Sequence, residues 1–283
     1  MGRGADHEVV DHLHTEKLAR RAQALGKGCV VLEWTPSPIR WLWPTFLRHL
    51  PTPLLPSRPM CGRISLIITN PDELGDQLEA DWEPGERERF KGPRYNVGPM
   101  QSHPILRAAS GHRALAYARW GVPRVIGKHA DGSLKISHPF NTVAETEITK
   151  PAWRKALTER RCIVPATSFY EWTGPKKARM PLSFARRDGG LLLLAGVYDE
   201  PKGDEPLGFS VLTTAPNATM AAIHDRMPVI LEAVAAGGWL DAGGDALLRP
   251  APDDLLVSAA ANPIMNRAGV EGPECLVVSA AAT

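Results

Sequence analysis

The pattern of hydrophobic and polar positions from residue 60 onward predicts strands with interspersed helices. Strand patterns occupy 63–69, 112–123, 162–173, 180–200, 208–217 and 274–279, and a loop feeds a further strand within 93–109. Helical spacing occupies 70–80, where Asn70 precedes Pro71, and 150–161, where Trp153 and Ala156 share one face. Within 180–200, the turn residues 188–190 (Asp-Gly-Gly) predict a hairpin between two strands. Because no regular β-α-β alternation occurs, we predict an α+β fold around a mainly antiparallel sheet.

Residues 1–59 show a different pattern. A possible short helix at 7–26 gives way to seven prolines between residues 36 and 59, and no core-forming pattern follows Gly28. Proline disfavours both helix and central strand. We expect 1–59 to be upstream DNA read as protein from a start codon assigned too early, with a disordered N-terminal extension as the alternative. The folded domain is then 60–283.

The composition is that of an ordinary globular protein, with 283 residues, 43% of them hydrophobic, and a net charge of +2. No window approaches the roughly 20 apolar residues of a membrane helix. The first twenty residues contain four acidic side chains, which argues against a secretory signal or transit peptide. We therefore expect a cytoplasmic protein without a membrane segment.

The cysteines predict reduced thiols. Cys29, Cys61, Cys162 and Cys275 lie far apart, without the C-x-x-C pairing of a zinc site or the spacing of a disulfide framework. Cys162 and Cys275 are expected to be buried structural thiols. We expect neither a metal nor another cofactor.

Basic residues crowd the stretch 150–187, which holds ten Lys and Arg against two Glu. Such crowding of one sign suits a solvated face or a surface that meets an anion, most often phosphate. The pattern alone leaves both interpretations open.

A few residues could carry chemistry. Glu171 stands between Tyr170 and Trp172, where burial would disfavour the charged carboxylate and suit it to proton transfer. A surface carboxylate paired with an arginine fits the same spacing. His224 could equally be a capping or core histidine, and spacing alone does not bring it together with Cys61 or Glu171.

Taken in chain order, seven segments resemble the signature series of the SRAP family, the SOS response-associated peptidase-like proteins. The segments are MCGR, RYNVGP, RWG, N-x-x-AET, RRCIVPA, FYEW and HDRMPVIL. The resemblance covers residues 61 to about 232 and, more loosely, the C-terminal part. It implies a single SRAP-like domain with a barrel-like sheet and peripheral helices. In that family the initiator methionine is removed, and the exposed cysteine crosslinks to an abasic site in single-stranded DNA.

The resemblance also implies a role for each matched residue. Cys61 matches the crosslinking nucleophile, Asn141 the asparagine that holds the opened sugar, Glu171 the acid/base glutamate, and His224 the histidine that promotes ring opening. Arg63 and Arg226 match arginines that contact the DNA backbone, and Trp172 matches an aromatic against which a base stacks. Single-stranded DNA with abasic sites is the implied partner, bound by a monomer that associates with the bacterial nucleoid during damage.

The chemistry of that family depends on a free N-terminal cysteine. An α-amine attacks the aldehyde of the opened sugar to form a Schiff base, and the thiol on the same residue closes a five-membered thiazolidine ring. In the chain as written, the nitrogen of Cys61 is a peptide nitrogen and cannot react in this way. We expect Met60 to be the functional start, or a cut after it to create the functional terminus, and the full-length chain to be inactive.

Two departures from the family pattern concern DNA affinity. Val143 replaces an arginine expected to touch DNA, and the segment after RWG lacks the usual second tryptophan. Losing one phosphate contact should weaken binding and lower its salt dependence by about one unit of slope.

Two other functions stay open. The first is a cysteine peptidase, self-cleaving at Met60-Cys61, with Cys61 as nucleophile, His224 as base and Glu171 as orienting residue. The second is a non-covalent DNA-binding module, which Val143 and the missing tryptophan do not favour.

Overall fold

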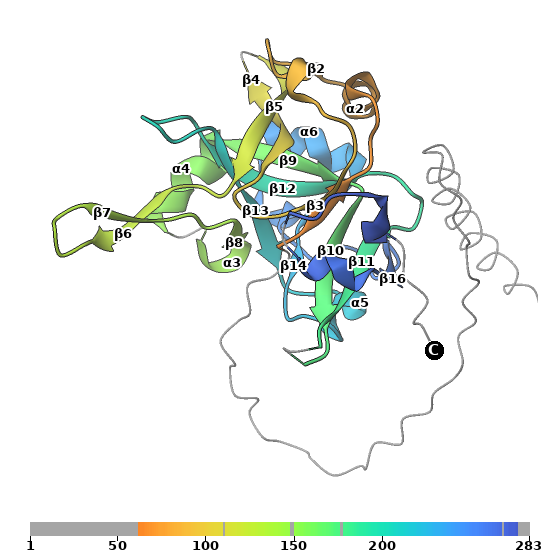
Figure 1. The fold of residues 1–283 in the computed structure, drawn as a ribbon. Coiled ribbons are helices and arrows are strands. Elements are labelled where there is room, and N and C mark those ends of the chain that lie inside the picture. The colour runs from red at the N-terminus through yellow and green to blue at the C-terminus, as the bar shows by residue number, and fades with distance from the viewer. Residues whose placement is uncertain (1–61, 110, 148–149, 176–177, 268, 277–283) are drawn as a thin grey trace, which may run out of the picture. The chain divides into compact units, whose positions relative to one another are not determined.

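Two β-sheets carry most of the fold in the computed structural model, which describes residues 62–109, 111–147, 150–175, 178–267 and 269–276. The smaller sheet has the strand order β16-β11-β10-β1-β3, and the larger one follows β14-β13-β12-β9-β4-β5-β2 (Figure 1). Residues 1–59, Met60 and Cys61, on which the predictions for the N-terminus depend, lie outside the described residues.

The bounds of the elements are as follows. The smaller sheet contains β1 (Ile64–Leu66), β3 (Arg94–Val97), β10 (Ser168–Thr173), β11 (Met180–Arg186) and β16 (Leu256–Ala260). The larger contains β2 (Asp81–Trp82), β4 (Ser102–Ala109), β5 (His112–Trp120), β9 (Arg161–Ala166), β12 (Leu192–Asp199), β13 (Gly208–Thr214) and β14 (Met227–Pro228). To it are attached β8 (Asn141–Val143) and β15 (Ile230–Leu231), while β6 (Arg124–Lys128) and β7 (Leu134–Ser137) form a separate pair. The helices are α2 (Pro71–Leu78), α3 (Ala144–Glu147), α4 (Pro151–Glu159), α5 (Ala218–Ala221) and α6 (Ala233–Asp241), with 3-10 turns η1 (Arg87–Arg89), η2 (Asp245–Leu247), η3 (Pro263–Asn266) and η4 (Pro273–Leu276).

Most neighbouring strands are antiparallel, so the predicted α+β fold with a mainly antiparallel sheet is confirmed. The parallel pairs are β13 with β5, β13 with β8, and β2 with β5. The pairing of β5 with β13 joins the two ends of the path β13-β12-β9-β4-β5, which gives this sheet its barrel-like closure. Stacked rings fill the interior, including Trp120 on Phe209 and Phe169 on Phe184.

The extended segment 162–173 passes from one sheet to the other. It breaks at Thr167, after which β9 belongs to the larger sheet and β10 to the smaller. Thr167 fixes the crossing, because its amide donates to the carbonyl of Ser65 at 2.7 Å and its hydroxyl accepts from the amide of Ile67 at 2.8 Å. Glu171 therefore lies in a different sheet from Cys162.

The predicted hairpin within 180–200 is wrong. The turn itself forms, since the amide of Gly189 donates to the carbonyl of Arg186 at 3.0 Å and Gly189 has a φ of 72°. However, β11 pairs with β10 and β16, whereas β12 pairs with β9, β13 and β15. A turn reverses the chain but does not choose the partner strand, and here it links two sheets.

The helices predicted at 70–80 and 150–161 are confirmed as α2 and α4. The side chain of Asn70 accepts from the amide of Asp72 at 2.9 Å, and Pro71 opens α2. In α4, Trp153 and Ala156 are buried as their spacing predicted. Cys162 and Cys275 are buried as expected, and burial raises the pKa of the Cys162 thiol.

One predicted strand is not found, and one ribbon has no counterpart among the predicted elements. The strand predicted at 274–279 is a 3-10 turn at 273–276, and 277–279 lie outside the described residues. The residues between RWG and Asn141 form an antiparallel ribbon of β6 and β7 that projects from the body (Figure 1). None of the helices in the described part of the chain is long and apolar enough to cross a membrane.

Candidate functional site

Strand β10 places Glu171 and Trp172 directly beside the start of the described chain. The amide of Tyr170 donates to the carbonyl of Arg63 at 3.0 Å, and Ile64 pairs with Phe169 in the antiparallel register of β1 and β10. Glu171 is buried, with 5% of its surface exposed, although it is charged in its ordinary state. Arg63, directly before β1, thus lies beside the strand that carries Glu171.

Arg63 is held between glycine backbone and an indole ring. Its guanidinium carbon lies 5.9 Å from the centre of the Trp172 ring, a distance typical of a cation–π contact. A Cβ added to Gly98 would lie 3.1 Å from the Nε atom of Arg63, so a glycine at this position lets the side chain lie close to the backbone. Burial lowers the pKa of Arg63. The glycine of the RYNVGP segment, Gly98, therefore leaves room for the Arg63 side chain.

Trp172 is fixed from the C-terminal part of the chain. Its indole Nε1 donates to Oδ1 of Asn266 at 2.6 Å, and Nδ2 of Asn266 donates to the carbonyl of Arg179 at 3.2 Å. Sequence reasoning missed Asn266, because nothing near it in the chain points to Trp172.

Asn141 opens β8, which runs parallel to β13 with Asn141 opposite Val211. The residue before it, Phe140, is locked in place, because its carbonyl accepts from Nε1 of Trp120 at 2.8 Å and from the amide of Val211 at 2.9 Å. A Cβ built on Gly62 would lie 3.9 Å from the Phe140 ring. Gly62, the residue bonded to Cys61, therefore lies next to the ring that precedes Asn141.

His224 lies after the short helix α5, with 8% of its side chain exposed. Its Nδ1 accepts a hydrogen bond from the amide of Arg226 at 3.1 Å and also lies 2.9 Å from Oδ1 of Asp225. One nitrogen cannot accept from the amide and donate to the carboxylate at the same time. Gain of a proton at Nδ1 therefore exchanges one bond for the other.

Arg226 is engaged with Glu145, the glutamate of the AET motif. Its two terminal nitrogens contact the Glu145 carboxylate at 3.1 and 2.6 Å, and it also donates to the carbonyl of Thr213. Glu145 accepts in addition from the Thr214 hydroxyl and the amide of Ala215, both at 3.1 Å. Burial by itself would raise the pKa of Glu145, but the bonds and charge of Arg226, with smaller help from backbone and Thr214, outweigh it and lower that pKa.

Glu145 therefore links two parts of the site. It follows β8, which carries Asn141, and it holds the segment that carries His224 through Arg226. Sequence reasoning quoted this glutamate as part of a motif and gave it no role. The sequence offered one indication of this ion pair, because the acidic Glu145 and the basic Arg226 each belong to a matched motif. Val143, the departure from the family pattern, pairs with Thr213 in the same region.

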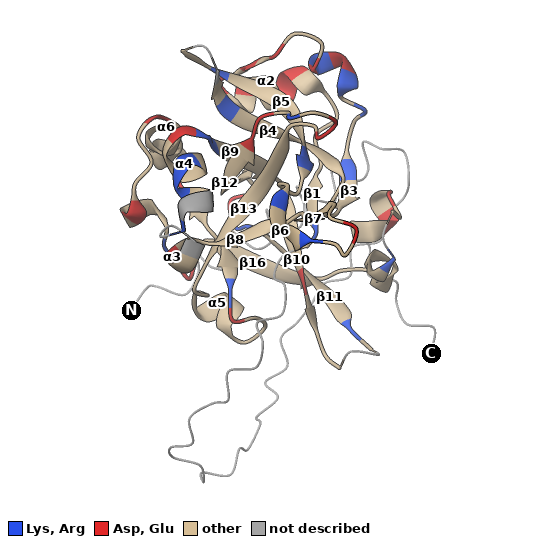
Figure 2. Cartoon of the chain, turned by 90° about the vertical axis from the view of Figure 1, so that its left-hand side faces the viewer, with Lys and Arg blue, Asp and Glu red and all other residues tan. Residues whose placement is uncertain are grey.

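Two arginines of the basic stretch 150–187 form ion pairs with acidic residues outside it. Arg160 pairs with Asp199 at 2.9 Å, and Arg186 pairs with Asp188 at 2.6 Å. Arg161 is buried and donates to backbone carbonyls at the ends of α4 and α6. Figure 2 shows basic and acidic residues distributed over several elements of the fold. These three arginines are therefore engaged by contacts within the protein.

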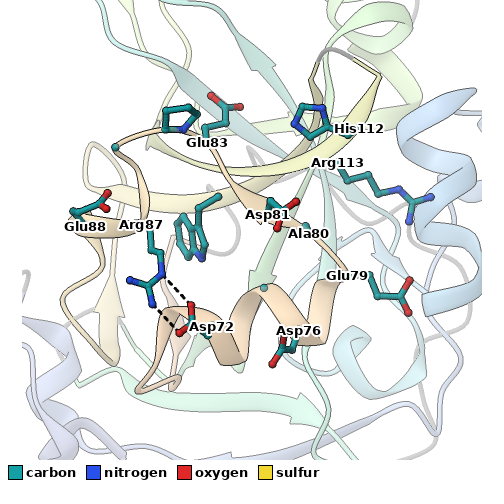
Figure 3. A pocket seen from close by; sticks show the side chains of 14 residues that line it. Asp72, Asp76, Glu79, Ala80, Asp81, Glu83, Arg87, Glu88, His112 and Arg113 are labelled. Carbon is teal, nitrogen blue, oxygen red and sulfur yellow. Dashed lines mark hydrogen bonds and ion pairs between the residues drawn. The ribbon is translucent and has the colours of Figure 1, made fainter.

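An open, polar pocket lies elsewhere on the molecule, between α2, β2, η1 and the start of β5 (Figure 3). Its lining holds six acidic residues against two arginines and one histidine, with Asp72 bound to Arg87 at 2.7 Å. It contains none of the residues predicted for the site, and its acidic lining would repel a phosphate backbone. Among the described residues, no group of His, Cys, Asp and Glu is arranged to hold a metal ion.

The chain is similar to known proteins in sequence and in fold. The family model "SOS response associated peptidase (SRAP)" matches residues 60–267. The abasic site processing protein YoqW of Bacillus subtilis is 32% identical over 227 residues, which cover 77% of this chain and 99% of that protein. The abasic site processing protein HMCES of Xenopus tropicalis is 29% identical over 262 residues, which cover 77% and 78%. A solved structure from Bacteroides thetaiotaomicron, 20% identical, superimposes with a TM-score of 0.65 over 78% of this chain and all of that one.

Proposed function

Because this chain belongs to the SRAP family, we propose that it processes abasic sites in DNA and does so by a covalent crosslink through Cys61. The supporting observation is the setting of Gly62 and Arg63, the two residues that follow Cys61. They lie between the strand that carries Glu171 and the ring that precedes Asn141. A reactive group on residue 61 would therefore be tethered within a few residues of this setting.

The proposed reaction joins an aldehyde and an aminothiol with loss of one water. The α-amine of Cys61 adds to the sugar aldehyde, and the resulting carbinolamine loses its hydroxyl as water to give a Schiff base. The thiol gives its proton to the imine nitrogen as sulfur bonds to the imine carbon, which closes the thiazolidine. Amine and thiol share one residue, so ring closure is intramolecular and has a high effective concentration.

We assign the proton transfers to Glu171 and His224, whose side chains are little exposed. We assign Glu171 to the amine, because its strand contacts the backbone of Arg63. We assign His224 to the sugar oxygen, since its Nδ1 can exchange an amide bond for a carboxylate bond as it gains a proton. Asn141 would hold the opened sugar through its amide.

The DNA strand would meet Arg63 and Trp172 first. Arg63 supplies positive charge beside an aromatic face, the combination that single-stranded DNA sites use. Arg226 would have to share its guanidinium between phosphate and Glu145, so we expect phosphate affinity to depend more on Arg63.

The free terminus provides the direct test. Protein expressed from Met60 should form a heat-stable adduct with a single-stranded oligonucleotide that carries one abasic site, whereas the full-length chain and the Cys61→Ala variant should not. Cys61→Ser should also fail, because a hydroxyl is a poor nucleophile for ring closure. Equal adduct formation by Cys61→Ser and the unsubstituted protein would refute the thiazolidine.

Kinetics of two variants test the proton transfers. Glu171→Gln should slow adduct formation by about 10²- to 10⁴-fold, the range of general acid–base catalysis. His224→Ala should slow formation less but also slow release of the adduct when free abasic DNA is added as a trap. Unchanged rates in both variants would remove these residues from the mechanism.

The same protein preparations distinguish the peptidase alternative. Incubation with a peptide pool should leave the peptides intact. Turnover of peptides by the protein that begins at Cys61, without any DNA adduct, would replace the crosslinking proposal with a peptidase.

A further inference from the structure

The β6–β7 ribbon exposes an apolar stripe that the proposed function does not explain. The exposed fractions are 61% for Val125, 58% for Ile126, 53% for Leu134 and 43% for Ile136. Val125 stands opposite Ile136, and Leu134 stands opposite Lys128, so Val125, Ile136 and Leu134 share one face. Ile126 occupies a bulge in the register. An isolated two-stranded ribbon is marginal in water, and an exposed apolar stripe on one usually marks a contact surface.

The root of the ribbon is firmly attached to the body. Arg124 forms an ion pair with Asp199, and its guanidinium lies 4.3 Å from the centre of the Trp153 ring. At the other strand, His138 contacts Glu205 at 3.3 Å, and Glu205 also pairs with Arg119. The stripe is thus presented by a rigid base, which distinguishes it from a loose surface loop.

The ribbon leads directly into the candidate site. After β7 ends at Ser137, the carbonyl of Pro139 accepts from the amide of Val122 at 3.2 Å, and Phe140 and Asn141 follow. Phe140 is the ring that faces Gly62. A DNA strand with its abasic sugar at Asn141 would therefore pass the root of this ribbon. The five residues of β6 span roughly 16 Å, several times the ~3.4 Å spacing of stacked bases.

The charge of the ribbon favours a nucleic acid as its partner. Lys128, His129 and Lys135 are exposed along it, and Asp131 at the turn is its one acidic residue. Two copies of the ribbon would bring like charges together, which disfavours self-association through this face. DNA offers opposite charge together with the flat apolar faces of bases.

We propose that the β6–β7 ribbon contacts the nucleobases that flank the abasic site. This inference rests on the proposed function, because it takes single-stranded abasic DNA as the ligand. A base next to an abasic site has lost its stacking neighbour on one side. The apolar side chains of Val125 and Ile136 then cover that exposed face, as apolar wedges do in other DNA complexes, while Lys128, which stands opposite Leu134 on the same face, contacts a phosphate.

The test measures equilibrium binding of the full chain to labelled single strands with a central tetrahydrofuran, an abasic analogue without an aldehyde. This analogue cannot form the covalent adduct, so binding is separated from crosslinking. The Val125→Ser/Ile136→Ser variant should bind about 10-fold more weakly, the order of effect expected for one lost base stack. On a second DNA strand, in which the nucleotides beside the analogue also lack bases, the affinity of this serine variant should match that of the unsubstituted chain within about 2-fold. Val234→Ser, which changes a side chain that is 92% exposed on α6, is the matched control and should bind normally.

Two more variants complete the test. Val125→Leu/Ile136→Leu keeps the apolar face and should retain the affinity of the unsubstituted chain. Lys128→Gln should reduce the slope of log affinity against log salt by about one unit, whether or not flanking bases are present.

Each outcome has a definite meaning. Normal affinity of the serine variant, or an equal loss on both strands, would overturn the ribbon contact and leave the proposed function standing. A dimer of the unsubstituted chain in light scattering that the serine substitutions dissociate, with DNA affinity unchanged, would assign the stripe to a second copy instead. Failure of the unsubstituted chain to bind either strand would overturn the ribbon contact, whereas the proposed function is decided separately by adduct formation with the protein expressed from Met60.

Discussion

Replacing Glu145 by glutamine tests whether the site depends on the link between β8 and the His224 segment. The substitution keeps the shape of the side chain but removes its charge, and it turns one oxygen facing Arg226 into an NH₂ group. Each hydrogen bond to a charged group is worth roughly 1.5–3 kcal/mol when desolvated, whereas exposed pairs give under ~1 kcal/mol. The side chain of Glu145 is 44% exposed and that of Arg226 18%, between these limits. We expect the free energy of unfolding at pH 7 to fall by about 1.5 kcal/mol, out of a total of ~5–15 kcal/mol.

The pH dependence of this loss follows from the lowered pKa of Glu145. A carboxyl whose folded-state pKa lies below its unfolded value of about 4.3 stabilises the fold above that value. The contribution disappears as the pH falls through the folded-state pKa. Urea denaturation should therefore show a constant difference between the unsubstituted chain and Glu145→Gln from pH 7 to about pH 5, and a shrinking one below.

The functional effect should accompany the structural one. Because Glu145 positions Asn141 and His224 without touching substrate, we expect crosslinking by the Glu145→Gln protein begun at Met60 to slow by about 10-fold, less than the ~10²-fold that a 1 Å displacement can cost. Glu88→Gln, which changes an exposed carboxylate on η1, is the control. Unchanged stability at pH 7, or a difference that persists undiminished at pH 3, would refute the ion pair as the link.

Three further predictions concern other buried contacts. Arg161→Lys should lower the free energy of unfolding by about 3 kcal/mol in urea titrations, because one ammonium cannot serve the carbonyls at the ends of both α4 and α6. His103, whose pKa burial lowers to about 4, should make the protein less stable as the pH falls from 6.5 toward 4, and His103→Gln, which can still donate to the carbonyl of Pro165, should remove that part of the pH dependence. Asn266→Ala should weaken binding of abasic-analogue DNA several-fold in anisotropy titrations, because Trp172 loses the acceptor of its indole N–H; equal binding would show that Trp172 is oriented by packing alone.

Elements with local signals could be predicted from the sequence, whereas sheet membership could not. Asn70 and Pro71 define the start of α2 within a few residues. The partner of a strand depends on residues far away, as Thr167 and Gly189 show. Both stand at tight connections between strands, and in each case the two strands belong to different sheets. The hairpin expected at Gly189 failed because the turn chemistry is the same whether or not the flanking strands pair.

The candidate site divides in the same way. Arg63 and Glu171 belong to matched motifs and could be nominated from the sequence, whereas their proximity could not be predicted; the amide of Tyr170, next to Glu171, donates to the carbonyl of Arg63. Glu145 and Asn266 could not be predicted, because each acts through contacts with residues 69 to 94 positions away in the chain. Arg161 was counted as surface charge, since sequence does not reveal that the carbonyls of two helix ends surround it.

The attachment of residues 63–67 explains why a crosslinking group at residue 61 would be effective. Chain termini usually fray unless tertiary contacts hold them. Here Arg63 accepts a backbone bond from Tyr170, Ser65 bonds to the Ser168 hydroxyl at 2.7 Å, and Ile64 pairs with both β10 and β3. A chain that began at Cys61 would have only two residues before the first of these contacts, a reach of about 7 Å. That short tether would keep amine and thiol close to Glu171 at little entropic cost, so the fold itself would supply the proximity that the proposed ring closure needs. The 60 residues that precede Cys61 in the full chain would leave β1 in place but convert the amine to a peptide nitrogen, which is why we expect crosslinking to depend on the terminus while folding does not.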